Sequence, residues 1–150
     1  MKVESLILLF AEDDDEDWML IEEALETCDQ DSYERVKNGE ELLSRLLEGN
    51  VPHMVILDIR MPRMDGFAAL EEIRKDPFLR HLPVMVMTTS KSDIDIARSY
   101  ACGANGYLVK PTTFPLMKEM LGQARRYWAE LVELPEGPWL PKEIKAGGVI

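Results

Sequence analysis

The sequence predicts an α/β protein in which the strands of a doubly wound parallel sheet alternate with crossover helices. Two observations carry this prediction. Short apolar runs alternate with amphipathic stretches through five rounds, which is typical of strands joined by helices. Most of the apolar runs have no charged residue, as expected for strands that are buried on both faces of a parallel sheet. We therefore expect five strands and five helices.

Five segments are predicted to form the strands, and the second is the weakest because its letters are YERV. In chain order they cover residues 5–11, 33–36, 54–57, 84–87 and 106–109. Turn-forming residues mark the loops between them, among them Asn38-Gly39, Asp76-Pro77 and the segment 104–106.

Apolar residues recur at helical spacing in the gaps between the strands. The first three gaps contain Trp18, Ile21, Ala24 and Leu25, then Leu42, Leu43, Leu46 and Leu47, then Phe67, Leu70 and Ile73. In the fourth gap, we expect Ser90 or Ser92 to cap a helix over residues 94–101. The last and longest helix is expected over residues 114–131.

The length of 150 residues fits one domain, which we place at residues 1–134. Residues 135–150 hold three prolines and three glycines and form a tail that is too short for an output domain.

Charge, hydrophobicity and cysteine content argue against several classes of protein. The formal net charge of -11 disfavours direct binding to nucleic acid or to anionic membranes. No apolar run reaches the roughly 20 residues of a membrane span, and six acids follow the apolar start where a signal peptide would be cleaved, so we expect a cytoplasmic protein. Cys28 and Cys102 lack metal-site spacing and are expected to be small buried residues.

Polar side chains follow four of the predicted strands directly. Glu12 and Asp13 follow the first, Asp58 the third, Thr88 the fourth and Lys110 the fifth. Because ligands bind at the carboxyl ends of strands in open parallel sheets, we expect these groups to converge on one rim.

The residue types on this rim indicate phosphoryl transfer. Three clustered carboxylates repel one another unless a cation neutralises them, and oxygen ligands suit Mg²⁺. A metal ion and the ammonium of Lys110 beside one carboxylate would hold a phosphoryl group, and the carboxylate could then be the nucleophile.

The segments FAEDD, VILDIRMPRMDG, PVMVMTTS and GANGYLVKP, in this order and spacing, resemble the receiver domain of two-component response regulators, the CheY-like family. The resemblance covers about residues 5–131. It implies a flavodoxin-like sheet with strand order 2-1-3-4-5. Within the family, the sequence is most similar to the single-domain regulators associated with bacterial phytochromes and other sensor kinases.

The resemblance assigns roles at the metal and acceptor site. Asp58 would be the phosphoacceptor, the alternative being an Asp that caps a turn. Asp13 would bind Mg²⁺, Glu12 would ligate it through water or hold that shell, and the backbone carbonyl of Arg60 would be a further ligand. Glu12 stands where the family often has Asp, which lengthens one arm of the site.

The remaining roles concern switching and the lifetime of the phosphorylated state. Lys110 would pair with phosphoryl oxygens and Thr88 would donate its hydroxyl. Tyr107 would be the aromatic switch, the alternative being an ordinary core tyrosine. Arg60 and Ser90 occupy the two variable flanking positions that tune dephosphorylation in this family.

The implied function is a switch rather than an enzyme. A sensor histidine kinase, with the phytochrome type as one candidate, would phosphorylate Asp58, and an unknown downstream protein would bind the fourth helix, fifth strand and fifth helix. The long last helix would overhang the sheet, and Tyr127, Trp128 and Leu131 could bury against a second copy as a homodimer.

Three alternatives differ in their sequence requirements. A haloacid dehalogenase-type phosphatase needs a second Asp where Arg60 stands, and a calcium-binding EF-hand needs a glycine where Trp18 stands. A pseudo-receiver that only binds partners is the stronger rival, although such proteins usually lack one of the site residues that are all present here.

The acidic run from Glu12 to Asp17 is expected to divide into two parts. Glu12 and Asp13 belong to the metal site. Residues 14–17 lie where the next helix begins, where carboxylates cap free N–H groups and interact with the helix dipole.

Overall fold

A computed structural model describes residues 5–27 and 31–134. Within them, five parallel strands form one sheet in the order β2-β1-β3-β4-β5, as the family resemblance implied. The strands are β1 (Ile7–Ala11), β2 (Ser32–Val36), β3 (Met54–Leu57), β4 (Val84–Thr88) and β5 (Gly106–Val109). The predicted tail at 135–150 and Cys28 lie outside the described residues.

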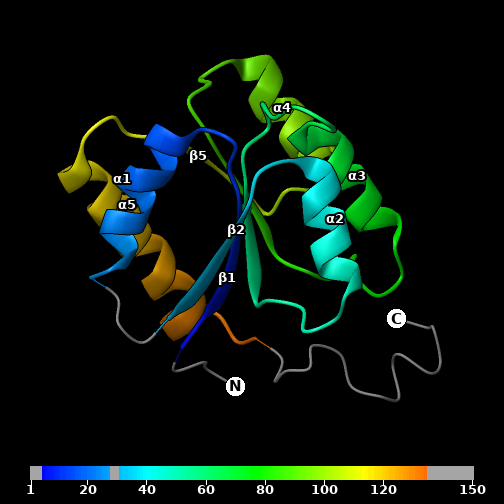
Figure 1. Ribbon diagram of the computed structural model, residues 1–150, viewed down its shortest axis with the longest axis horizontal. Helices are drawn as coiled ribbons and strands as arrows, with labels where there is room; N and C mark the ends of the chain where they lie inside the picture. The colour runs from blue at the N-terminus through cyan, green and yellow to red at the C-terminus, as the bar shows by residue number, and fades with distance from the viewer. Residues whose placement is uncertain (1–4, 28–30, 135–150) are drawn as a thin grey trace.

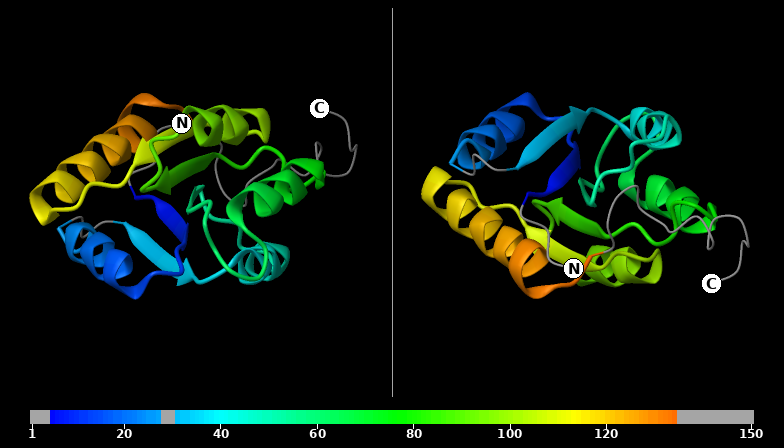
Figure 2. Two further views of the ribbon diagram at one scale, coloured as in Figure 1. Left: turned by 90° about the horizontal axis from the view of Figure 1, so that it is seen from above. Right: turned by 90° about the horizontal axis from the view of Figure 1, so that it is seen from below.

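Helices cover both faces of the sheet, as Figures 1 and 2 show. Helices α1 (Asp15–Leu25) and α5 (Phe114–Arg126) pack side by side on one face, and α2 (Gly39–Leu47) and α3 (Gly66–Lys75) pack on the other. Helix α4 (Asp93–Ala101) packs against β5, the strand at one edge of the sheet. One helix therefore follows each strand, as predicted.

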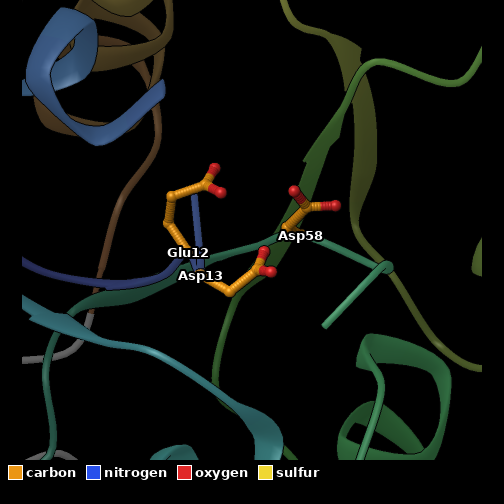
Figure 3. Close-up of side chains that lie close together, drawn as sticks. All are labelled: Glu12, Asp13 and Asp58. Carbon is orange, nitrogen blue, oxygen red and sulfur yellow. The ribbon is translucent and has the colours of Figure 1, made fainter. Parts of the chain in front are cut away.

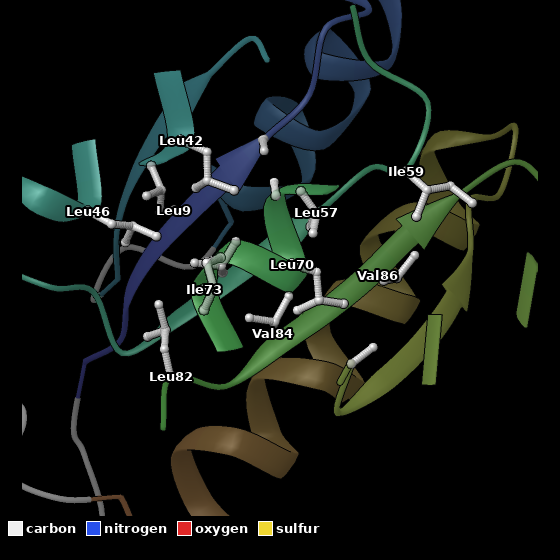
Figure 4. Close-up of a cluster of buried hydrophobic side chains, with 14 of the residues drawn as sticks. Leu9, Leu42, Leu46, Leu57, Ile59, Leu70, Ile73, Leu82, Val84 and Val86 are labelled. Carbon is white, nitrogen blue, oxygen red and sulfur yellow. The ribbon is translucent and has the colours of Figure 1, made fainter. Parts of the chain in front are cut away.

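Two hydrophobic cores hold these layers together, one on each face of the sheet. On the α2 and α3 face, Leu42 and Leu70 are almost fully buried against the central strands (Figure 4). On the other face, Ile21 of α1 and Met117 of α5 pack against β1 and β3. Burying one such side chain stabilises the fold by about 1.5–3 kcal/mol, so the helical spacing seen in the sequence fixes which face each helix presents.

Four helices begin with a side-chain cap that the sequence supplies. The carboxylates or amide of Asp14, Asn38 and Asp65, and the hydroxyl of Ser92, each accept the backbone N–H three residues later. Ser92 is thus the cap of α4, one of the two serines proposed for it. These caps place the starts of α1 to α4 at the carboxyl end of the sheet, around the predicted rim.

The observed boundaries differ from the predicted ones by one residue at the starts of β2 and α4, and further differences occur at three places. Strand β1 begins at Ile7 rather than residue 5, and β4 extends to include Thr88 because this residue pairs with Val109 of β5. The last α-helix ends at Arg126 and continues as a π-helical turn, η1 (Tyr127–Leu131), in which the N–H of Val132 donates to the carbonyl of Tyr127 at 2.9 Å.

The π-helical turn determines which side chains are buried and which are exposed at the end of the long helix. Ala129 and Leu134 are buried, and Trp128 packs partly against the core beneath α5. Tyr127 and Leu131 remain exposed, with 53% and 70% of their surface accessible. Of the three residues expected to overhang, Trp128 therefore contributes to the core of its own chain.

Two further expectations concern Cys102 and membranes. Cys102 is half-buried rather than buried, because it follows α4 near the surface, where its Sγ donates to Glu71 Oε1 at 3.4 Å. Across residues 5–27 and 31–134, no helix has the length and apolar character to cross a membrane.

Candidate functional site

The register of the strands brings the predicted rim residues together. Ala11 pairs with Leu57, so the segments that begin at Glu12 and Asp58 leave the sheet side by side, and the Asp58 N–H donates to the Ala11 carbonyl at 3.0 Å. On the other side, the Lys110 N–H donates to the Thr88 carbonyl at 2.7 Å. Residues far apart in sequence thus meet at one edge.

Three carboxylates form a compact cluster at this edge. Figure 3 shows Glu12, Asp13 and Asp58, whose ligand oxygens all lie within 4.8 Å of one another. Glu12 and Asp58 are buried, with 2% and 7% of their surface accessible, whereas Asp13 is more exposed. Oxygen donors at this spacing suit a hard divalent cation that is reached from the side of Asp13.

The ammonium of Lys110 lies beside this cluster, and each of its three N–H groups has a carboxylate partner. Its Nζ lies 2.5 Å from Glu12 Oε1, 2.7 Å from Asp58 Oδ2 and 2.8 Å from Asp17 Oδ2, and its side chain is 3% exposed. Burial opposes the charge of Lys110, but the hydrogen bonds that its ammonium donates to Asp17, Asp58 and Glu12 outweigh this effect and raise the pKa of Lys110. The site therefore holds a permanent positive charge beside Asp58.

Glu12 behaves differently from an ordinary carboxylate. Burial raises its pKa to about 7, and the nearby charge of Asp58 acts in the same direction, although the hydrogen bond from Lys110 opposes both. In the absence of a metal ion, Glu12 therefore titrates near neutral pH. A divalent cation would compete with that proton for the same carboxylate.

Asp17 is a member of the site that the sequence interpretation missed. The sequence pattern assigns residues 14–17 to the start of α1, yet the Asp17 carboxylate accepts from Lys110. Its position in the first turn of α1 gave no sign of this contact, because Lys110 comes from another element of the fold.

The rest of the acidic run behaves as predicted. Asp14 caps α1 and accepts the Asp17 N–H at 2.9 Å. Asp15 pairs with Arg35 of β2 at 2.9 Å, and this hydrogen bond lowers the pKa of the exposed Asp15 carboxyl. Asp15 is thus paired with β2 rather than with Lys110.

A close approach of two backbone segments holds Asp58 in place. The Arg60 N–H donates to Asp58 Oδ1 at 3.1 Å, while Lys110 binds the other oxygen. The Gly66 N–H donates to the Ile59 carbonyl, and a Cβ at Gly66 would lie only 2.4 Å from the Asp58 carbonyl oxygen. Glycine is therefore required where the start of α3 meets the segment that carries Asp58.

Thr88 and Tyr107 occupy the other side of the site. The Thr88 hydroxyl is buried and has no hydrogen-bond partner among the residues that the structure describes. A buried hydroxyl without a partner is costly, and an incoming oxygen acceptor would satisfy it. Tyr107 is half-buried, and its hydroxyl donates to the Ser90 carbonyl at 2.9 Å.

The two flanking residues, Arg60 and Ser90, both contact a residue of α4 that the sequence interpretation did not single out. Arg60 Nη2 lies 3.0 Å from Asp95 Oδ2, and the Ser90 hydroxyl donates to the same oxygen at 2.6 Å. In the sequence, Asp95 reads as an acid in the first turn of α4, three residues after its Ser92 cap. Only the fold places it beside Arg60 and Ser90.

Comparison with known proteins identifies one family model that matches most of the chain. The model of the response regulator receiver domain matches residues 8–122. A probable methanogenesis regulatory protein, FilR2 of Methanothrix harundinacea, is 38% identical over 128 residues, which cover 81% of this chain and 83% of the relative.

Two further relatives have solved structures. Response regulator Rcp1 of a Synechocystis strain is 31% identical over 137 residues, covering 86% of this chain and 92% of Rcp1. The crystal structure of Mn²⁺-bound Rcp1 superimposes with a TM-score of 0.79 at 29% identity, covering 87% and 99% of the two chains. The phosphorylated cyanobacterial phytochrome response regulator RcpA superimposes with a TM-score of 0.81 at 29% identity, covering 88% and 99%.

Proposed function

Because the chain belongs to the family of response regulator receiver domains, we propose that it is a phosphorylation-operated switch with Asp58 as the phosphoacceptor. The donor is the phosphohistidine of a sensor histidine kinase. An oxygen of the Asp58 carboxylate attacks phosphorus, the phosphorus–nitrogen bond to the histidine breaks, and the imidazole keeps the bonding electrons and takes up a proton.

The observation that carries the proposal is the environment of Asp58. Its two oxygens are fixed by the Arg60 N–H and the Lys110 ammonium, and the unpartnered Thr88 hydroxyl lies at the end of the strand beside β3. Lys110 compensates charge on the transferring group, and Thr88 gains the acceptor that it lacks. Both features suit an acceptor carboxylate better than a structural ion pair.

The carboxylate cluster supports a requirement for Mg²⁺. Asp13 and Asp58 would bind the ion, Glu12 would act through water or directly, and the backbone carbonyl of Arg60 would complete the protein ligands. The bound ion would neutralise negative charge on the phosphoryl group. The relative Rcp1 crystallised in a Mn²⁺-bound form, which favours a divalent ion here.

The signal would leave the domain through α4, β5 and α5. Thr88 moves toward the phosphoryl group, and Tyr107, which is tied to the β4–α4 loop through the Ser90 carbonyl, changes its position with that loop. Phytochrome-type kinases are the favoured input, because the relative RcpA is a phytochrome response regulator.

We also propose a homodimer, whose contact involves two of the three residues predicted from the sequence. Tyr127 and Leu131 expose apolar surface at the end of the long helix, whereas Trp128 is partly buried against the core of its own chain.

Incubation with acetyl phosphate and Mg²⁺, followed by intact-protein mass measurement, tests the function. We expect the wild type to gain one phosphoryl group, Asp58→Asn to gain none, and Asp65→Asn to behave like the wild type. Asp65 is a matched control because it lies in the same loop, where asparagine also caps a helix. A wild type that gains no phosphoryl group would favour the pseudo-receiver.

A further inference from the structure

Asp95 of α4 joins the two residues that flank the phosphoacceptor. Its Oδ2 accepts from Arg60 Nη2 at 3.0 Å and from the Ser90 hydroxyl at 2.6 Å. The Asp95 side chain is 18% exposed, whereas that of Arg60 is 68% exposed. A single carboxylate oxygen therefore holds a largely exposed arginine against α4.

The position of Arg60 matters because its backbone touches the reacting carboxylate. The Arg60 N–H donates to Asp58 Oδ1 at 3.1 Å, so its long side chain starts beside the acceptor. The ion pair with Asp95 commits the guanidinium to α4. Released from Asp95, the guanidinium would be attracted to a phosphoryl group on Asp58, since such groups carry a charge of about −1.5 to −2.

We propose that Asp95 is a positioning residue for dephosphorylation: it holds the Arg60 guanidinium on α4 and leaves the phosphorylated Asp58 accessible to water. In this reaction, a water oxygen attacks phosphorus, the bond to the Asp58 oxygen breaks, and the carboxylate leaves while the water loses a proton. A guanidinium over the phosphoryl group would exclude that water and slow the reaction. This inference rests on the proposed phosphorylation of Asp58.

The contacts of Asp95 also define an informative substitution. Asp95→Asn removes the charge that holds Arg60 but keeps an oxygen that can accept from the Ser90 hydroxyl. The loop that carries the Ser90 carbonyl and its bond from Tyr107 therefore stays in place. Asp93→Asn is the matched control, because Asp93 is the other acid in the first turn of α4 and loses the same charge.

The test measures the decay of the phosphorylated protein after removal of acetyl phosphate, at constant Mg²⁺. We expect Asp95→Asn to lengthen the half-life by about threefold or more, and Asp93→Asn to leave it unchanged. In an Arg60→Ala background, Asp95→Asn should have no effect, because the residue through which Asp95 acts is gone. Thermal unfolding of each variant checks that the fold is retained.

Three results would overturn the inference, and they can be told apart. An unchanged half-life in Asp95→Asn means that Asp95 does not restrain Arg60 during hydrolysis. A longer half-life that persists in the Arg60→Ala background means that Asp95 acts by another route. A wild type that never becomes phosphorylated contradicts the proposed function itself, and the inference with it.

Discussion

Lys110 Nζ and Asp17 Oδ2 lie 2.8 Å apart, although 93 positions separate the two residues in the chain. Asp17 lies in the first turn of α1 and Lys110 follows β5, so this contact spans the rim of the site. Together with Glu12 and Asp58, Asp17 occupies all the donors of the buried ammonium. The lysine thus balances carboxylates from the acidic run after β1 and from the end of β3.

The first prediction concerns the energetic role of Lys110. Replacing it by methionine leaves Glu12 and Asp58 buried without their cation, which should lower the free energy of unfolding by about 3–5 kcal/mol in the absence of Mg²⁺. The measurement is denaturant unfolding of both proteins at one fixed pH, because loss of Lys110 also removes the interactions that lower the pKa of Glu12. Adding Mg²⁺ should restore part of the loss. Equal stability of the variant and the wild type without metal would show that the lysine does not balance these charges.

The second prediction tests how the acidic run divides. Asp13→Ala should reduce Mg²⁺-dependent phosphorylation by at least about tenfold, because a ligand is lost from the cluster. Asp15→Ala should leave phosphorylation nearly intact, because Asp15 is exposed and pairs with Arg35. The comparison uses initial rates with acetyl phosphate over a range of Mg²⁺ concentrations. Similar losses in both variants would show that the metal site extends further along the run.

Most residues of this site could be predicted from the sequence because they immediately follow strands. In a parallel sheet, the ends of the strands meet at one edge, so Glu12, Asp13, Asp58 and Lys110 could be placed together from their positions alone. Strand order came only from the family resemblance, since periodicity does not say which strands are neighbours.

The sequence could not reveal contacts that depend on how far a side chain reaches across the fold. Asp17 and Asp95 both read as acids in the first turn of a helix, which is where helices generally place them. Their partners, Lys110 and Arg60, come from other elements, so only the packing of α1 and α4 identifies the pairs. The π-helical turn after Arg126 was missed for a similar reason, since its helical pattern continues unbroken in the sequence.

The third prediction concerns the glycine beside Asp58, Gly66. In Gly66→Ala, the new Cβ would lie 2.4 Å from the Asp58 carbonyl oxygen, so backbone must move and stability should fall by about 1–3 kcal/mol. Gly122→Ala is the control, because the nearest atom to a Cβ there is a flexible arginine end at 3.9 Å within α5. That substitution should stabilise the protein by about 0.5–1 kcal/mol. Thermal or denaturant unfolding measures both, and the role given to Gly66 is wrong if its alanine variant is also stabilised.

The fourth prediction is a pH effect at the opposite end of the sheet. The Ile7 N–H donates to His53 Nδ1 at 2.9 Å, which requires a neutral ring, and burial lowers the pKa of His53 below its usual 6.5. The unfolded chain therefore takes up this proton first as the pH falls. Stability from His53 is complete above pH 6.5 and declines as the pH drops toward the lower folded-state pKa.

His53→Asn isolates this contribution, because the asparagine oxygen can accept from Ile7 but does not titrate. Unfolding free energies of both proteins are compared between about pH 7.5 and pH 5.5. The wild type should lose more stability than the variant over this interval. Parallel curves would show that His53 does not titrate differently in the folded and unfolded states.

The central claim is that Asp58, among all the acids of the rim, receives the phosphoryl group. Borohydride reduces an aspartyl phosphate to homoserine, which peptide mass spectrometry can locate after treatment of the wild type with acetyl phosphate and Mg²⁺. We predict homoserine at position 58 alone. Homoserine at position 13 or 17 in place of position 58 would contradict the assignment of Asp58.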